Sequence, residues 1–568
     1  MIESKPWLKL YPKEIPATIE YSSDPIQTYL ENSAANYPDK VAIHFMGKEL
    51  TFKQLHEEAV KFAGYLQNHI GIIKGDRVAI MLPNTPQAVI SYFAILLAGG
   101  IVVQTNPLYT ERELEYQMKD SGAKAIVTLD ILYPRVTKVM PQTGLKHIIV
   151  TCIKDYLPFP KNLLYPFIQK KQYGLVVKVK HEGNSHLLSE ILKMKPLKLT
   201  KYEINPDEDL ALLQYTGGTT GFPKGVMLTH KNLMANTTMS EKWMYKCHPG
   251  EETILGIVPF FHVYGMTVCM LLSIKMAGKM ILMPKFDALE TLKTIHKQRP
   301  TLFPGAPTIY IGLLNHPDIK KYDLSSIEVC ISGSAPLPLE VQQKFEEVTN
   351  GKLVEGYGLS EASPVTHTNF LWDVERVKGS IGVPYPDTEA KIIAVGSEEP
   401  LPPGEIGEIV IKGPQVMKGY WNRPDETAEV LKDGWLYTGD LGYMDEKGYF
   451  YVVDRKKDMI IAGGYNIYPR EIEEVLYEHP DVVEVVAAGV PDPYRGETVK
   501  AYIVLKEGAK VTSEEMNQFA RKYLAAYKVP RIYEFRDELP KTAVGKILRR
   551  QLVEEEKKKI DEQNKNHA

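Results

Sequence analysis

Short apolar runs alternate over about the first 450 residues with segments whose apolar residues recur at helical spacing. The runs that predict strands are residues 78–82, 124–129, 147–151 and 209–216, and the periodic segments that predict helices are residues 111–120 and 339–348. The longest apolar stretch, 88–104, contains two adjacent glycines. It therefore indicates a buried helix, a glycine turn and a strand rather than a membrane span. This alternation is typical of α/β layers around large sheets.

The pattern changes near residue 454, where a short strand runs into a charged turn, Asp454 to Lys457. A compact series of helix, strand, strand and helix follows, and its last helix opens with a capping box from Thr512 to Glu515. We therefore predict an α/β protein of two domains. Residues 1–454 form a large multi-layer α/β domain with a β-rich, barrel-like piece near 380–450, and residues 455–568 form a small, mobile α+β domain.

Composition narrows the class of protein. The chain has 568 residues, of which 44% are hydrophobic and 24% charged, as in globular proteins, and its net charge of -3 gives no reason to expect nucleic acid as a partner. The four cysteines form no metal-binding or CxxC spacing, which favours small buried residues in a reducing compartment. The N-terminus has no apolar run after a basic start, so we expect a cytoplasmic protein without a secretory signal.

Residues 157–180 are unusual because aromatic residues and leucines are interleaved with lysines and no acidic residue interrupts them. The lysines are Lys161, Lys170, Lys171, Lys178 and Lys180. Such a segment can lie at an anionic membrane surface, which would place the protein at the inner face of the cell membrane. An ordinary surface insertion of helix and loop is the simpler interpretation, and it stays open.

The strongest motif is a glycine-rich loop that follows a predicted buried strand. Four glycines allow backbone N–H groups to approach phosphate oxygens, while threonine hydroxyls and a lysine add donors and positive charge. The predicted phosphate-binding residues are Thr216, Gly217, Gly218, Thr219, Thr220, Gly221 and Lys224. The loop is not a Walker A motif, because Pro223 precedes the lysine and Gly225 occupies the place of the magnesium-binding hydroxyl.

At this loop the chain resembles the adenylate-forming superfamily, which includes acyl-CoA synthetases, aryl-CoA ligases, luciferases and peptide-synthetase adenylation domains. The resemblance covers roughly residues 25–550. Further motifs at 331–336, 357–361, 437–440, 454–458 and 540–546 follow in the order of that family. Found together in this order, they make a chance match improbable.

The resemblance implies a role for each motif. Gly333, Ser334, Ala335 and Pro336 would form the adenine-side loop, and Tyr357, Gly358, Leu359 and Ser360 the stretch whose aromatic ring stacks on adenine. Asp440 and Arg455 would contact ribose, and Glu361 with Thr219 would bind Mg²⁺. Lys546 would be the adenylation lysine, with Thr219 and Lys224 holding the leaving pyrophosphate. Lys457 would be the pivot, and Gly463 and Gly464 would line the passage for coenzyme A.

The implied reaction has two steps. A carboxylate attacks the α-phosphorus of ATP and pyrophosphate leaves, and then the thiol of coenzyme A displaces AMP from the acyl-adenylate. Because two anions must meet in the first step, positioning by cations supplies most of the catalysis. The sequence offers no Ser-His-Asp or Cys-His set that would indicate a covalent nucleophile.

The acid is less sharply defined. The segment that resembles the acyl site contains His262, Val263, Gly265 and Met266. Peptide-synthetase domains usually carry an aspartate where this chain has His262, which argues against an amino acid. The hinge flanks, residues 99–127 and the 157–180 insertion look most like bacterial long-chain fatty-acyl-CoA synthetases. Met266, however, stands where some of these have a gating tryptophan.

Two alternatives remain at this point. The first is a medium-chain or aryl acid–CoA ligase of the same superfamily. The second is a membrane-docked acyl-binding protein with inactive adenylation machinery, against which Lys224, Glu361, Asp440 and Lys546 argue. The oligomeric state is not fixed by the sequence, and a homodimer is left open.

Overall fold

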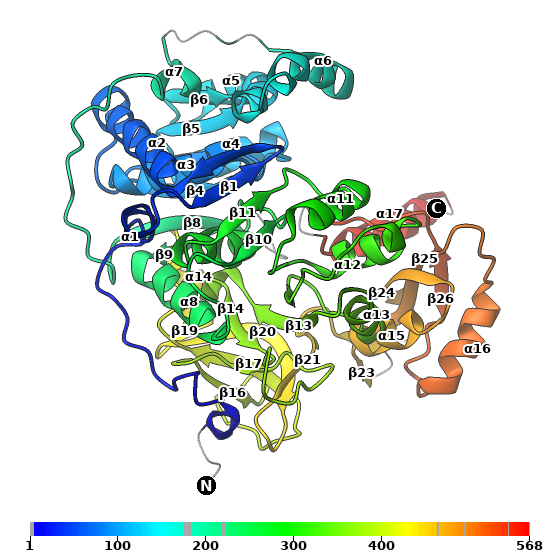
Figure 1. Ribbon diagram of the computed structural model, residues 1–568. Helices are drawn as coiled ribbons and strands as arrows, with labels where there is room; N and C mark the ends of the chain where they lie inside the picture. The colour runs from blue at the N-terminus through cyan, green and yellow to red at the C-terminus, as the bar shows by residue number, and fades with distance from the viewer. Residues whose placement is uncertain are drawn as a thin grey trace.

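The computed structural model describes residues 5–174, 176–177, 179, 183–216, 223–462, 465–492, 496–542 and 545–566. Within these residues the strands form five sheets, four of them in the larger part of the molecule and one in a smaller part at its side (Figure 1). The chain therefore has the large α/β part and the small second part that the sequence predicts. No helix in the described ranges is both long and apolar enough to cross a membrane.

The largest sheet has eight strands in the order β18-β9-β8-β4-β3-β5-β6-β7. Their bounds are Arg77–Met81 for β3, Ile101–Gln104 for β4, Ala125–Leu129 for β5, His147–Thr151 for β6, Ser185–Leu187 for β7, Leu210–Thr216 for β8, Lys224–Thr229 for β9 and Gly419–Tyr420 for β18. Strands β4, β3, β5, β6 and β7 pair in parallel, and β9 pairs antiparallel to β8. All four predicted strands are confirmed.

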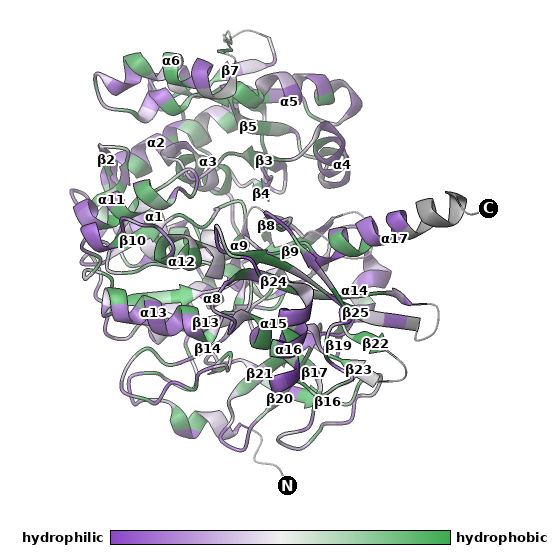
Figure 2. Ribbon diagram, turned by 90° about the vertical axis from the view of Figure 1, so that its right-hand side faces the viewer, coloured by the Kyte–Doolittle hydropathy of each residue, from purple (hydrophilic) through white to green (hydrophobic). Residues whose placement is uncertain are grey.

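Helices cover both faces of this sheet because successive side chains of each strand point to opposite faces. Val78 and Ile80 pack in one hydrophobic core with α2 and α3, whereas Ala79 and Met81 pack in another with α4 and α5. The helices are Phe52–Tyr65 for α2, Pro86–Leu97 for α3, Glu111–Ser121 for α4 and Tyr133–Val139 for α5. The predicted helix at 111–120 is thus confirmed. Figure 2 shows the contrast between apolar central strands and the polar surface of α4.

The stretch 88–104 folds as predicted. Helix α3 ends at Leu97, Gly99 adopts a left-handed φ of 82°, and β4 begins at Ile101. A side chain at Gly99 would collide with the ring of Tyr202. Glycine is therefore required here for two reasons: the backbone has a positive φ, and a side chain would have no room.

Two four-stranded sheets continue the larger part, in the orders β10-β11-β1-β2 and β12-β13-β14-β15. Their bounds are Val41–Phe45 for β1, Lys48–Thr51 for β2, Thr253–Gly256 for β10, Lys279–Leu282 for β11, Val329–Ser332 for β12, Lys352–Gly358 for β13, Val365–Thr368 for β14 and Val383–Pro384 for β15. The surrounding helices are Thr28–Asn36 for α1, His230–Trp243 for α8, Ala288–Gln298 for α11, Pro307–Leu314 for α12 and Leu339–Thr349 for α13. Helix α13 confirms the prediction at 339–348.

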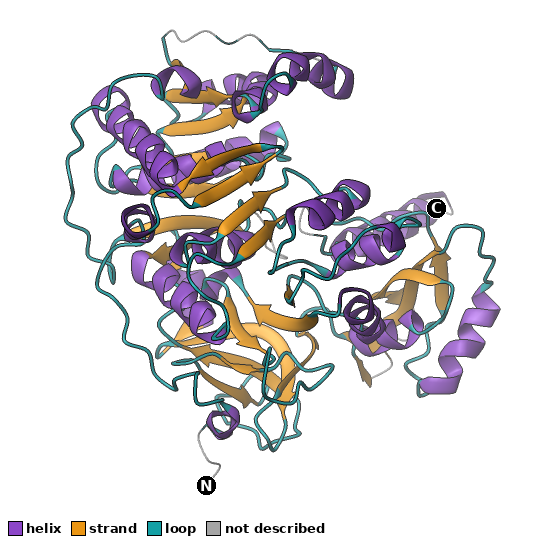
Figure 3. Ribbon diagram, in the orientation of Figure 1, coloured by secondary structure: helices purple, strands orange, loops and turns teal. Residues whose placement is uncertain are grey.

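The predicted β-rich piece is a fourth sheet of five strands. Its strands are Glu389–Ile393 for β16, Gly407–Lys412 for β17, Leu431–Lys432 for β19, Trp435–Met444 for β20 and Phe450–Arg455 for β21. Figure 3 shows these strands gathered below the helical layers, close to the N-terminal end of the chain. Strand β21 leads directly into the charged turn at 456–458.

The smaller part has its own hydrophobic core, built from Ile460 onward around the sheet β23-β22-β25-β24 with β26 beside β25. Its elements are Ile460–Ala462 for β22, Tyr465–Ile467 for β23, Pro469–Tyr477 for α15, Val482–Asp492 for β24, Gly496–Leu505 for β25, Ser513–Tyr523 for α16, Ile532–Phe535 for β26 and Arg549–Asn566 for α17. The capping box of α16 is present, with both hydrogen bonds between Thr512 and Glu515.

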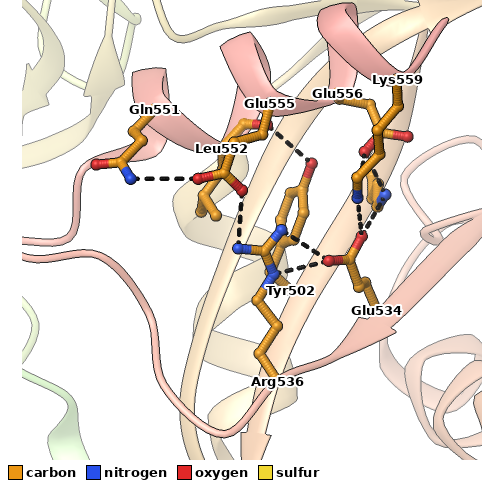
Figure 4. A network of polar contacts seen from close by, with 9 residues as sticks. Tyr502, Glu534, Arg536, Gln551, Leu552, Glu555, Glu556 and Lys559 are labelled. Carbon is orange, nitrogen blue, oxygen red and sulfur yellow. Dashed lines mark hydrogen bonds and ion pairs between the residues drawn. The ribbon is translucent and has the colours of Figure 1, made fainter. Parts of the chain in front are cut away.

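Helix α17 is attached to this sheet by ion pairs (Figure 4). Lys500 of β25 is 4% exposed and lies 2.7 Å from both Glu534 and Glu556, and Arg536 pairs with Glu534 and Glu555. A buried lysine between two carboxylates is satisfied only while both partners stay in place. The network therefore fixes α17, and with it the loop that precedes α17, on the sheet.

Candidate active site

A cavity of about 1540 Å³ lies between the two parts of the molecule, and residues of both line it. From the sequence-predicted set, its wall contains Thr216, Lys224, His262, Val263, Gly333, Ser334, Ala335, Pro336, Tyr357, Gly358, Leu359, Ser360, Glu361, Asp440, Arg455, Lys457 and Lys546. Motifs separated by more than 300 positions along the chain thus meet at one place. The predicted residues Gly217, Gly218, Thr219, Thr220, Gly221, Gly463 and Gly464 lie outside the described residues.

The ends of the glycine-rich loop are held by the large sheet. Thr216 closes β8 and Lys224 opens β9, and the two are paired in register. The ammonium group of Lys224 forms an ion pair with Glu426 and lies 4.9 Å from the ring centre of Tyr420. Lys224 is therefore placed at the cavity by a carboxylate and an aromatic face that the sequence analysis did not identify.

Glu361 follows β13 in a short 3-10 turn, Ser360–Ala362. Its Oε1 accepts a hydrogen bond of 2.8 Å from the hydroxyl of Tyr420, and its backbone oxygen accepts one from Met417. Burial and the neighbouring Glu361 carboxylate raise the pKa of Tyr420, so this hydroxyl stays a donor. The described residues contain no group of three or more His, Cys, Asp or Glu suited to a metal. A single carboxylate fits an ion such as Mg²⁺, which takes most of its ligands from phosphates and water.

Tyr357, near the end of β13, donates a hydrogen bond of 2.6 Å to Asp440 Oδ2, and Arg455 Nε lies 3.5 Å from Asp440 Oδ1. Asp440 and Arg455 are neighbours because β20 and β21 pair them directly. The carboxylate of Asp440 is thus oriented from two sides and can accept further hydrogen bonds from a diol.

Ser334, in the loop predicted to lie beside adenine, adopts a positive φ of 73°. Its hydroxyl is buried, and it has no hydrogen-bond partner among the described residues. Gly333 packs against the ring of Tyr264, which leaves little room for a side chain at that position. The loop therefore offers an unpaired polar group at the cavity wall.

Lys546 reaches the cavity from the smaller part of the molecule. Burial, together with the positive charge of Arg455, lowers the pKa of Lys546 to about 8. Burial also lowers the pKa of His262 to about 4, and the charge of Lys546 adds to this effect. His262 is therefore neutral, and its Nδ1 accepts a hydrogen bond from the backbone of Tyr264.

The turn that carries Lys546 is closely defined. The backbone N–H of Lys546 donates to Thr542 Oγ1 at 3.1 Å, and the N–H of Thr542 donates to the carbonyl oxygen of Lys546 at 2.8 Å. Gly545 has a φ of 80°, and a Cβ at this position would overlap Thr308 at the start of α12. Only glycine permits both this backbone conformation and this approach to the larger part.

Arg549 lies just after the turn that carries Lys546 and is held there by ion pairs. The sequence analysis did not identify this residue. It pairs with Asp458 at 2.8 Å and with Glu473 at 2.7 Å, and lies 3.7 Å from Asp454. Burial raises the pKa of Asp454 to about 6, although the positive charge of Arg549 acts to lower it. The four residues are up to 95 positions apart, and no local pattern in the sequence connects them. The one available signal was the position of Arg549, three residues after the predicted lysine.

The predicted acyl-site residues divide into two sets. His262 and Val263 lie on the cavity wall, whereas Gly265 and Met266 are not among the residues that line it. A Cβ at Gly265 would collide with the carbonyls of Val258 and Pro259, so this glycine serves the turn. Met266 is fully buried and begins a π-helical turn, Met266–Leu271. A contact between Met266 and the acid stays a prediction.

Comparison with known proteins places the chain. The model of the AMP-binding enzyme family matches residues 30–421, and that of the AMP-binding enzyme C-terminal domain matches residues 471–546. A long-chain-fatty-acid–CoA ligase of Bacillus subtilis (strain 168) is 61% identical, covering 98% of this chain and 99% of that protein. A protein of the same name from Escherichia coli O157:H7 is 43% identical over 98% of this chain and 99% of its own length.

Solved structures agree. That of the anthranilate CoA ligase AuaEII in complex with anthranoyl-AMP matches with a TM-score of 0.85 and 26% identity, covering 96% of this chain and all of that one. That of ATP-bound MatB from Rhodopseudomonas palustris matches with a TM-score of 0.80 and 29% identity, over 94% of this chain and 99% of that one. The chain has the adenylate-forming enzyme fold and belongs to the AMP-binding enzyme family, together with the long-chain-fatty-acid–CoA ligases that it matches over almost its whole length.

Proposed function

We propose that this enzyme is a long-chain fatty-acid–CoA ligase, which converts ATP, a fatty acid and coenzyme A into acyl-CoA, AMP and pyrophosphate. The observation that carries the proposal is the position of Lys546, which meets the nucleotide motifs of the larger part in one cavity. The 61% identity to a relative of that name supports the choice of acid.

In the first step an oxygen of the fatty-acid carboxylate forms a bond to the α-phosphorus of ATP, and the bond from that phosphorus to pyrophosphate breaks. Lys546 lies between the two anions and offsets their repulsion, an effect that is large only in a water-poor site. Lys224, with Thr219 of the glycine-rich loop, holds the leaving pyrophosphate. Asp440 and Arg455 hold the ribose, and Tyr357 packs on the adenine.

Mg²⁺ would be held by Glu361 and Thr219, and when bound it supplies charge neutralisation for the phosphates. The one carboxylate at this position fits such a role. Glu361 itself orients toward the site through its hydrogen bond from Tyr420.

In the second step the sulfur of coenzyme A bonds to the acyl carbonyl carbon, the thiol proton is released and the bond to AMP breaks. This step uses a second arrangement of the smaller part, reached by a turn at Lys457, in which Gly463 and Gly464 line the passage for the thiol arm. A two-arrangement lid suits a two-step reaction in one cavity. A medium-chain or aryl acid–CoA ligase is the alternative within the family, and an inactive membrane-docked acyl-binding protein is the alternative outside it.

A substrate panel tests the acid. Palmitate has about eight more methylenes than octanoate, worth about 6 kcal/mol if each buried methylene contributes about 0.8 kcal/mol. We expect kcat/KM for AMP release to be higher for acids of roughly twelve carbons or more than for octanoate, since longer chains bury more apolar surface. A preference for benzoate, coumarate or acetate would contradict the proposal, and no ATP-dependent thioester at all would favour the inactive alternative.

The pKa of Lys546 predicts a pH profile. Because its pKa is about 8, its charge is present below pH 8 and is lost above it. We therefore expect kcat/KM for fatty-acid-dependent ATP–pyrophosphate exchange to fall as pH rises through 8. Lys546→Arg keeps its charge at alkaline pH and should lose this inflection, whatever its absolute rate. An identical inflection in the arginine variant would assign the titration to another group.

Two substitutions separate the half-reactions. Lys546→Ala should abolish ATP–pyrophosphate exchange yet convert supplied acyl-adenylate to thioester, because only the first step needs a charge between two anions. Gly464→Leu should keep exchange and lose thioester formation, because a side chain would obstruct the thiol arm. If the variants have the same melting temperature as the wild type but lose both half-reactions equally, the proposal of two arrangements is refuted.

We further propose that the enzyme contacts an anionic membrane through α6, Lys161–Tyr173. The solvent face of this helix is apolar: the exposed fractions are 79% for Phe159 just before it, 62% for Leu163 and 75% for Phe167. The opposite face is anchored by Gln169, whose amide donates to Asp130. An exposed apolar face beside lysines is the arrangement expected at a lipid surface.

Charge neutralisation tests this contact. Lys178 and Lys180 of the predicted segment lie outside the described residues, so the test replaces Lys161, Lys170 and Lys171 with glutamine. This removes about 3 kcal/mol of attraction at about 1 kcal/mol per lysine, so the binding constant for phosphatidylserine vesicles, measured by co-sedimentation, should fall by roughly two orders of magnitude. Activity on dispersed fatty acid should survive, since none of the described residues of α6 lines the cavity.

The matched control is Lys13, Lys557 and Lys558 replaced together with glutamine. These exposed lysines lie elsewhere on the surface, so the same change in net charge should leave vesicle binding unaltered. Wild-type protein that ignores such vesicles at low salt would end the membrane proposal and favour an ordinary surface insertion.

A further inference from the structure

A buried ion pair joins the two parts of the molecule at the wall of the same cavity that Lys546 lines. Glu355 lies on β13 in the larger part, and Arg470 lies on α15 in the smaller part. Its atoms Oε1 and Nη2 are 3.7 Å apart, and the two residues are only 8% and 7% exposed. Because β13 belongs to the larger part and α15 to the smaller part, the pair lies at the contact between the parts.

The other contacts of Arg470 fall into two groups: those to the larger part, which depend on this arrangement, and one within its own helix, which does not. Its guanidinium donates to Val452 O at 2.9 Å, and its backbone N–H donates to Asp454 Oδ2 at 2.9 Å. Both acceptors precede the proposed pivot Lys457, as Glu355 does. By contrast, Glu474, which lies 2.9 Å from Arg470 Nε, is on the same helix and would move with it.

Separation of this pair would remove the guanidinium from beside a carboxylate that is only 8% exposed in this arrangement. Breaking a buried pair costs far more than breaking an exposed one, because the remaining charge keeps its desolvation penalty. Burial raises the pKa of Glu355 to about 7, and Arg470 acts against that rise. The carboxylate therefore depends on Arg470 to stay charged near neutral pH.

We propose that the Glu355–Arg470 ion pair is a latch that selectively stabilises the arrangement with Lys546 in the cavity, and so favours adenylation over thioester formation. In this proposal both are positioning residues, because their ion pair holds the smaller part in place, although both also line the cavity. The proposal rests on the two arrangements of the proposed function and adds the contact that biases their equilibrium.

The test measures both half-reactions in Glu355→Gln. The amide keeps the shape of the side chain and removes its charge, so the adenylation arrangement should become less populated. We expect ATP–pyrophosphate exchange to fall about tenfold, with conversion of supplied acyl-adenylate to thioester unchanged or faster. Glu355→Asp keeps the charge with a shorter reach and should retain intermediate exchange.

Glu474→Gln is the matched control. It removes a carboxylate from the same guanidinium, but within one part, and should leave the ratio of the two half-reactions unchanged. An unchanged ratio in Glu355→Gln, or an equal shift in Glu474→Gln, would overturn the latch. If Lys546→Ala loses both half-reactions while the ratio in Glu355→Gln is unaltered, the two arrangements themselves fail. If Lys546→Ala loses only adenylation while Glu355→Gln leaves the ratio of the two half-reactions unchanged, the latch alone is refuted. Thermal unfolding of each variant shows whether it folds.

Discussion

The rest of the site depends on one electrostatic constraint, which is that a carboxylate and a triphosphate repel each other and must be brought together by a fixed positive charge. An ammonium group acts strongly only where water is scarce, and scarcity of water disfavours the ammonium itself. Lys546 shows this conflict directly, since the burial that makes its charge useful lowers its pKa to about 8. The surrounding structure has to hold that charge in place.

Several features serve this end. The Thr542 hydrogen bonds and the φ of Gly545 define the turn, Arg549 fixes the start of α17, and the Lys500 network holds that helix on its sheet. In the larger part, the pairing of β20 with β21 places Asp440 next to Arg455, two residues before the proposed pivot Lys457. The proposed ribose-binding carboxylate and the start of the proposed hinge are therefore parts of one β-ladder, so a change at one can reach the other through direct strand pairing.

Much of this was predictable because the relevant signals are local. Apolar runs identified β3, β5, β6 and β8, and the glycine-rich loop and the turn at Lys546 are contiguous motifs. The missed residues act across long separations. Tyr420 orients Glu361, Glu426 holds Lys224, and Glu355 meets Arg470, and no periodicity connects the members of these pairs. Met266 was assigned to the acyl site by resemblance; its side chain is fully buried, and its contact with the acid stays a prediction.

The chemistry of the boundary between the two parts completes this account. The boundary contacts described above are ion pairs, hydrogen bonds and the close approach of Gly545 to Thr308. A large apolar interface would hold one arrangement too firmly to release it, since its burial is lost all at once. Polar contacts can be exchanged for others or for water at little net cost, while a buried pair among them still biases the equilibrium. An interface built in this way can favour adenylation without preventing the rearrangement that the second step requires.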